Sequence, residues 1–310
     1  MYYELLKLAS TNKYYELPIQ KGAVWSMRTA PHALISGQTG FGKSYFVNYL
    51  TALCSIKGNV LYLCDPKNSD ISSLSDYMPK GRVESSKDGI CHILDDVIQI
   101  MEKRYDYMKT NRLKRNLFQA DFVDFNLPVI MVVIDELASF VSSLEKKVRI
   151  QFESDMQAIT LLGRQCGIII TNICQSPNSH NINTESRSQM GFRVFLGNSG
   201  GIEYRMLFGE GYSFPSRVYK PGQGLYMISG QLDSPELIET PRLDKSKLAD
   251  TLKKSLEIQY ALDPFDNTPV LHSCSEAKAE QDGFKDKGGL DYDAPLKSSE
   301  KCQGCDKKDG

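Results

Sequence analysis

Long hydrophobic runs are absent from this sequence: the longest, Val129 to Ile134, has only six residues. A membrane-spanning helix needs about 20 apolar residues in succession, so we expect no transmembrane segment of its own. The first residues, Met1 to Glu4, also lack the basic and apolar regions of a signal peptide. Both absences predict a cytoplasmic protein, whose cysteines need not form disulfides.

An excess of one charge is also absent. The chain has 37 Lys and Arg against 38 Asp and Glu, a formal net charge of −1, and 41% of its 310 residues are hydrophobic. This composition excludes a wholly disordered chain, a collagen-like chain and a strongly basic nucleic-acid coat protein. It leaves a local basic lining open, because net charge says little about one surface.

Between residues 31 and 240, short apolar runs alternate with longer amphipathic stretches. This alternation predicts an α/β fold, a mostly parallel sheet flanked by helices. The expected strands are Ala33–Ser36, Val60–Cys64, Val129–Ile134, Ile168–Ile173 and Phe192–Leu196, with Leu225–Ile228 as an edge strand. The expected helices are Lys43–Ser55, Ile93–Asn111 and Lys147–Gly163.

The two ends of the chain differ from this middle part. Residues 1–30 are rich in tyrosine and show little regular period, so we interpret them as an N-terminal extension. Residues 31–243 form the expected core. Residues 244–310 are polar and poor in aliphatic side chains, which predicts a largely disordered tail.

A phosphate-binding loop follows the first core strand. Residues 37–44 fit the pattern G-x4-G-K-[ST] and lie between an apolar strand and a helix-compatible stretch, the setting that the motif requires. Its glycines let successive N–H groups face a phosphate, its lysine reaches the β- and γ-phosphates, and its serine hydroxyl ligates Mg²⁺. The residues expected to bind ATP are Gly37, Gln38, Thr39, Gly40, Phe41, Gly42, Lys43, Ser44 and Tyr45.

Two acids end the most apolar of the expected strands. Asp135 and Glu136 follow Val129–Ile134 directly, and charges at such a position lie at the carboxyl edge of the sheet, where α/β ligands bind. We expect Asp135 to hold Mg²⁺ together with Ser44, and Glu136 to activate the attacking water. The alternative is a helix N-terminus that carries favourable acids.

Gln175 follows the strand Ile168–Ile173 and would contact the γ-phosphate or its water, or else make an ordinary loop hydrogen bond. Arginines in the second half of the core, Arg164 and Arg193 among them, are candidates for completing the site of a neighbouring subunit, as arginines do in oligomeric ATPases. Surface salt bridges are the alternative for each of them.

Two weaker patterns each allow two interpretations. Four residues near the C-terminus, His272, Cys274, Cys302 and Cys305, would suit zinc or belong to a solvated, reduced tail. A basic cluster, Lys109, Arg112, Lys114 and Arg115, would contact a phosphate backbone or favour a helix C-terminus.

Eight ordered segments together resemble the FtsK/SpoIIIE/HerA group of DNA-pumping ATPases, and most of all the coupling proteins of conjugative or mobilisable elements of Gram-positive bacteria. The likeness covers residues 17–230. The segments are Pro31-His32-Ala33-Leu34-Ile35, Asp65-Pro66-Lys67, Met101-Glu102-Lys103-Arg104-Tyr105, Val132-Val133-Ile134-Asp135-Glu136-Leu137, Gly163-Arg164-Gln165-Cys166-Gly167-Ile168, Gln175-Ser176-Pro177, Phe192-Arg193-Val194 and Gly224-Leu225-Tyr226-Met227.

The resemblance implies a RecA-like P-loop core that uses ATP and Mg²⁺ and assembles as a ring, usually a hexamer, around double-stranded DNA. It also implies that Gln175 senses the γ-phosphate and that Arg164 and Arg193 act between subunits or as sensors. The chain departs from the group in lacking N-terminal membrane helices and a C-terminal winged-helix module, and in having Ser176 where the group has arginine.

These departures favour an ATP-driven DNA translocase that serves transfer or replication of a mobile genetic element over a chromosome-segregating motor. If it works at a membrane pore, a partner must recruit it there. The alternative function is an ATP-dependent adaptor that binds a relaxase or a replication initiator and pumps little DNA.

Overall fold

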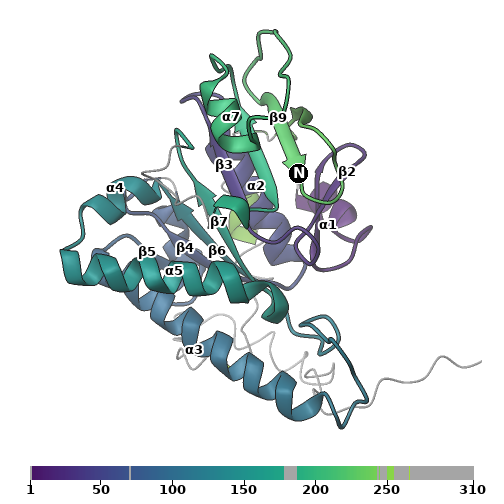
Figure 1. Cartoon of the computed structure of the whole chain (residues 1–310), viewed down its shortest axis with the longest axis vertical. Helices are drawn as coiled ribbons and strands as arrows, with labels where there is room; N and C mark the ends of the chain where they lie inside the picture. Colours follow the sequence, from purple (N-terminus) through teal and green to yellow (C-terminus); the bar gives the residue numbers. More distant parts are fainter. Residues whose placement is uncertain are drawn as a thin grey trace, which may run out of the picture.

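The computed structural model describes residues 2–69, 71–177, 187–242, 244, 250–254 and 265. Its centre is an eight-stranded sheet with the strand order β10-β9-β8-β3-β7-β6-β4-β5 (Figure 1). The strands from β3 to β8 run parallel to one another, whereas β9 and β10 are antiparallel to their neighbours. The predicted α/β class, a mostly parallel sheet flanked by helices, is confirmed.

The predicted strands match the observed ones closely because a parallel strand buried on both faces is a continuous apolar run. The parallel strands are β3 (Ala33–Gly37), β4 (Val60–Cys64), β5 (Val83–Glu84), β6 (Ile130–Asp135), β7 (Ile168–Ile173) and β8 (Phe192–Leu196). The antiparallel pair is β9 (Gln223–Ile228) and β10 (Glu236–Glu239). The prediction that Leu225–Ile228 is an edge strand is wrong, because β10 pairs with β9 and forms the edge itself.

The helices cover the two faces of the sheet. Along the sheet, the connection from β3 to β4 moves toward β5, whereas the connections from β5 to β6 and from β6 to β7 move back toward β3. Because such crossovers are right-handed, the helices of these two groups lie on opposite faces of the sheet. Figure 1 shows α3 and α5 side by side along one face, while α2 packs with α1 on the other. In the described ranges, the helices are α1 (Tyr2–Ala9), α2 (Lys43–Ile56), the 3-10 helix η1 (Ser72–Tyr77), α3 (Lys87–Asn111), α4 (Leu137–Ser142), α5 (Lys146–Cys166) and α7 (Ile202–Phe208).

The N-terminal segment has more regular structure than its sequence predicts. After α1 it forms an antiparallel hairpin of β1 (Glu16–Gln20) and β2 (Ala23–Ser26). Leu17, Ile19 and Trp25 of this hairpin have no exposed surface and join the core of the sheet. The sequence shows little regular period there because the buried side chains are spread over two short strands that mix apolar and polar residues. The division of the chain after residues 30 and 243 stays a prediction.

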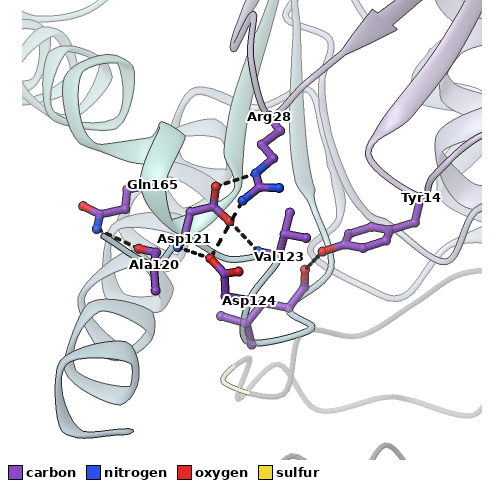
Figure 2. Close-up of polar contacts among 8 residues, drawn as sticks. Tyr14, Arg28, Ala120, Asp121, Val123, Asp124 and Gln165 are labelled. Atoms are coloured by element: carbon purple, nitrogen blue, oxygen red, sulfur yellow. Dashed lines mark hydrogen bonds and ion pairs between the residues drawn. The ribbon is translucent and has the colours of Figure 1, made fainter. Parts of the chain in front are cut away.

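Polar contacts fasten this N-terminal segment to the loop between α3 and β6. The Arg28 Nε donates to the Asp121 carboxylate at 2.6 Å, and the Tyr14 hydroxyl donates to the Leu127 carbonyl at 3.1 Å. Figure 2 shows the Arg28 guanidinium in contact with both Asp121 and Asp124, with Tyr14 reaching the same loop from another side. The loop is therefore held at the amino edge of the sheet, since β6 begins directly after it.

No helix in the described ranges is long and apolar enough to cross a membrane. Of the five cysteines that the structure describes, Cys54, Cys64, Cys166 and Cys174 are buried and Cys91 is partly exposed; all five are free thiols. The four candidate zinc ligands lie outside the described residues. The predicted disordered tail does so too, except for residues 244, 250–254 and 265.

Candidate nucleotide-binding site

The predicted phosphate loop joins the carboxyl end of β3 to the first residue of α2. Three of its glycines have φ values that favour glycine: Gly37 at 140°, Gly40 at 82° and Gly42 at 93°. A Cβ atom on Gly37 would overlap the carbonyl oxygen of Leu196, so that position also excludes a side chain for lack of space. The loop thus has the glycine-dependent turn that lets N–H groups converge on an anion ahead of a helix.

Neighbouring strands support this loop at two points. The Gln38 N–H donates to the carbonyl of Leu196 at 3.0 Å, at the end of β8. The Gly222 N–H donates to the carbonyl of Phe41 at 2.9 Å, and the Thr240 N–H donates to the carbonyl of Gly222 at 2.8 Å. The loop therefore rests on β8 and on the turn that leads into β9, both of which lie far away in the sequence.

Lys43 is the first residue of α2, and its ammonium group folds back over the loop. It donates to the carbonyl oxygens of Gly37 and, at 3.0 Å, of Gln38. Burial lowers the pKa of this ammonium, while the charges of Glu136 and Asp135 oppose that effect. Ser44, the next residue, is exposed at the start of the same helix. A lysine, an exposed hydroxyl and a helix N-terminus at one place fit a nucleotide polyphosphate with Mg²⁺.

The two predicted acids lie at the carboxyl end of β6, on the same edge of the sheet. Asp135 is the last residue of β6, and Glu136 follows it in the left-handed region at φ 53° and ψ 54°. Burial, with the nearby charge of Asp65 as the next contribution, raises the pKa of Asp135 to about 6. A carboxylate held among other acids in this way fits a bound divalent cation, which would relieve their repulsion.

Gln175 also reaches this edge. The Cys174 N–H donates to the carbonyl of Ile35 at 3.0 Å, and the Ser36 hydroxyl donates to the carbonyl of Gln175 at 3.3 Å. The end of β7 is thereby fixed beside the last residues of β3, directly before the phosphate loop. The Gln175 residue is exposed there, and its role toward the γ-phosphate stays a prediction.

The two arginines lie elsewhere. Arg164 is exposed in the last turn of α5, two residues before Cys166 and therefore at the amino edge from which β7 starts. Arg193 lies inside β8 opposite Leu34, and its guanidinium donates to the carbonyl of Leu207 at 3.2 Å and to the Ser229 hydroxyl at 3.3 Å. Within one chain the structure does not bring either arginine to the phosphate loop.

Sequence reasoning missed two residues of this edge as site residues. The Lys67 Nζ lies 3.3 Å from the Glu136 Oε2, and the fully buried Asp65 lies close enough to Asp135 to raise its pKa. The signal was present, since both belong to the triplet at residues 65–67 directly after β4. The basic cluster starts in the last turn of α3 at Lys109 and continues beyond the helix end at Asn111; whether it contacts DNA stays a prediction.

Comparison with known proteins agrees with this architecture. The chain is 32% identical over 194 residues to an FtsK domain-containing protein, YdcQ, of Bacillus subtilis. The matched region covers 63% of this chain and 40% of that protein. It is 26% identical over 249 residues to the DNA translocase FtsK of Staphylococcus aureus, covering 74% of this chain and 30% of the translocase. No family model matches.

Among solved structures, the conjugation coupling protein TcpA of pCW3 superposes with a TM-score of 0.66 at 18% identity, over 80% of this chain and 72% of that one. This likeness shows the fold. The chain spans well under half the length of the two sequence relatives. The resemblance predicted from the eight segments is confirmed: this chain is similar in sequence to FtsK-domain proteins and has the fold of a P-loop ATPase.

Proposed function

We propose that this chain is the ATPase core of a double-stranded DNA translocase that serves transfer or replication of a mobile genetic element. The observation that carries the proposal is the meeting of the phosphate loop, Asp135 and Glu136 at one edge of the sheet. A phosphate-binding loop alone fits many nucleotide enzymes. A second acid beside the expected Mg²⁺ ligand supplies the base that hydrolysis needs, and the sequence relatives are named FtsK.

The proposed roles follow from the positions of the side chains. The loop from Gly37 to Tyr45 holds the phosphates, with Lys43 balancing their charge, and Ser44 and Asp135 hold Mg²⁺. Bound Mg²⁺ supplies charge neutralisation to the phosphates. Glu136 accepts the proton of the attacking water, and Gln175 orients that water or the terminal phosphate.

Arg164 completes the site of a neighbouring subunit in this proposal. It is exposed and lies at the amino edge of the sheet, so only a second copy of the chain can bring it to a phosphate loop. The proposed assembly is a closed ring, usually hexameric, around the duplex. Mixing Lys43→Ala protein with Arg164→Ala protein should restore up to about a quarter of the wild-type rate, because random assembly leaves that share of interfaces intact.

ATP hydrolysis measured with and without linear duplex DNA, at several protein concentrations, tests the proposal. We expect a rate that DNA stimulates and that rises cooperatively with protein concentration. Lys43→Ala should lose both hydrolysis and nucleotide binding. Glu136→Gln should lose hydrolysis and keep binding, because only the proton acceptor is removed, whereas Glu210→Gln, at an exposed glutamate after α7, should behave as wild type.

A normal rate of hydrolysis in Glu136→Gln would contradict the role given to that residue. A rate indifferent to DNA would instead favour the adaptor function, with a relaxase or a replication initiator as its partner. Displacement of a third strand from a triplex separates the two functions directly, because a moving motor strips that strand from the duplex and an adaptor leaves it in place.

A further inference from the structure

An ion pair at the carboxyl edge of the sheet joins Lys67 to Glu136. The Lys67 Nζ lies 3.3 Å from the Glu136 Oε2; the lysine side chain is 44% exposed and the glutamate side chain only 16%. Exposed ion pairs usually contribute little to stability, so stability alone gives no reason for this one. Its acidic partner is the residue proposed to activate water, which gives the pair a different significance.

Hydrogen bonds hold the backbone of the loop that carries Lys67. Asp65 is fully buried, and its carboxylate accepts from the backbone N–H of Ser69 at 2.6 Å and from the Ser69 hydroxyl. The Asn68 N–H donates to the Asp65 carbonyl at 2.9 Å, with Asn68 in the left-handed region at φ 51°. Pro66 has a fixed φ. The backbone on both sides of Lys67 is therefore fixed.

Glu136 is held from its own side. Strands β4 and β6 are neighbours, with Cys64 paired to Ile134, so the loop after β4 lies beside the two acids that end β6. The Glu136 N–H donates to the carbonyl of Ile173 at 2.9 Å, and its backbone has left-handed φ and ψ. Both partners of the ion pair thus come from backbones that are fixed independently of it.

The charges at this edge favour a cation at the position of Lys67. Asp65, Asp135 and Glu136 bring three acidic side chains to the adjacent ends of β4 and β6, and Lys67 carries the opposite charge beside them. The other lysine of the site, Lys43, is directed toward the carbonyl oxygens of the phosphate loop. In the part of the chain that the structure describes, Lys67 is the cation in ion-pair contact with Glu136.

We propose that Lys67 is a positioning residue for Glu136, holding its carboxylate in the orientation from which it acts on water. This inference rests on the proposed ATPase function. A glutamate side chain has several rotatable bonds, and most of its rotamers would move the carboxylate away from a reacting water. Small misplacements of that kind lower catalytic rates strongly and leave ground-state binding largely intact.

Steady-state kinetics of Lys67→Met tests the proposal. We expect kcat for ATP to fall by about 10- to 100-fold. The KM and the Kd of a fluorescent ATP analogue should change by less than about twofold, because Lys43 and the phosphate loop remain. Lys67→Arg should recover most of kcat, since a cation is restored. Lys80→Met, at an exposed lysine in the stretch that follows η1, is the matched control and should behave as wild type.

Acylation of lysines, read by mass spectrometry without nucleotide, gives a second readout that needs no hydrolysis. Pairing with Glu136 protects the Lys67 amine, so Glu136→Gln should raise its labelling several-fold while labelling of Lys80 stays constant. Any of three results would overturn the proposal. The kcat of Lys67→Met is unchanged or increased, its ATP affinity falls by the same factor as its kcat, or Lys67→Arg does not recover the rate. If no variant and no wild-type protein bound ATP, the proposed function would fail instead, and the labelling would still report the pairing.

Discussion

The carbonyl oxygen of Leu196, the last residue of β8, occupies the space that a Cβ atom on Gly37 would need. Gly37 pairs with Leu196 as a strand residue while its φ of 140° already turns into the phosphate loop. The same glycine therefore lets two strands approach and lets the loop begin.

Gly37→Ala should lower the free energy of unfolding by about 3 kcal/mol or more, because it adds backbone strain and a clash with a strand carbonyl. Urea denaturation followed by circular dichroism measures this change. Gly211→Ala is the control: a Cβ atom there meets nothing within 4 Å, and the expected change is within about 0.5 kcal/mol. Equal losses in the two variants would contradict the importance of the contact between β3 and β8.

His32 should make the fold sensitive to acid. It is fully buried, its Nδ1 accepts from the Ile170 N–H at 3.0 Å, and burial lowers its pKa from 6.5 to about 4. Between these two values the unfolded chain binds a proton that the folded chain excludes, so stability falls as pH drops from about 6.5 to 4. The full effect is about 3 kcal/mol.

Urea midpoints measured between pH 7 and pH 4.5 test this expectation. His32→Asn is the informative variant, because asparagine tolerates the φ of 55° at this position and offers an acceptor without a titrating group. Its stability should depend less on pH than that of the wild type over this range. Parallel curves for the two proteins would show that other groups cause the acid sensitivity.

Arg104 should be a structural residue. Its side chain is fully buried, and its guanidinium donates to the carbonyl oxygens of Cys166 and, at 2.7 Å, of Pro128. Arg104→Met should cost about 3 kcal/mol of stability, because a buried and a partly buried carbonyl lose a charged donor. Arg149→Met, at an exposed arginine near the start of α5, should change stability by less than about 0.5 kcal/mol. ATP binding by the folded fraction of Arg104→Met should be normal.

The ion pair of Arg28 with Asp121 should couple the N-terminal segment to the loop before β6. A double-mutant cycle of Arg28→Met and Asp121→Asn should give a coupling energy of about 1 kcal/mol, since both side chains are partly exposed. The coupling should shrink in about 0.5 M salt. Asp121→Ala should cost more than Asp121→Asn, because alanine also removes the acceptor of the Val123 N–H, which lies 3.0 Å from the Asp121 Oδ1 (Figure 2).

Most of the sheet could be predicted from the sequence because burial on both faces leaves a local signal. The strands Val60–Cys64, Ile168–Ile173 and Phe192–Leu196 agree with prediction to the residue. The strand β10 left no such signal, since Ile238 is its only buried residue and the other three are exposed. The hairpin of β1 and β2 was missed for a related reason, because its strands mix apolar and polar residues and form no continuous apolar run.

The candidate site, too, could be predicted from the sequence only in part. The phosphate loop could be predicted because its glycines, lysine and serine are consecutive, and Asp135-Glu136 because the acids interrupt an apolar run. The pairing of Lys67 with Glu136 depends on the register of β4 against β6, which no local pattern encodes. The internal bonds of Arg193 to Leu207 of α7 and to Ser229, directly after β9, likewise depend on tertiary structure.

The hydrogen bonds from Thr240 to Gly222 and from Gly222 to Phe41 have a mechanical consequence. They form a short chain of rigid backbone links between the end of β10 and the middle of the phosphate loop. A pull on the polypeptide beyond Thr240 would therefore reach the phosphate loop without passing through a flexible side chain. If the chain works as the proposed motor, this linkage would couple the phosphate loop to the polypeptide that follows β10 in both directions.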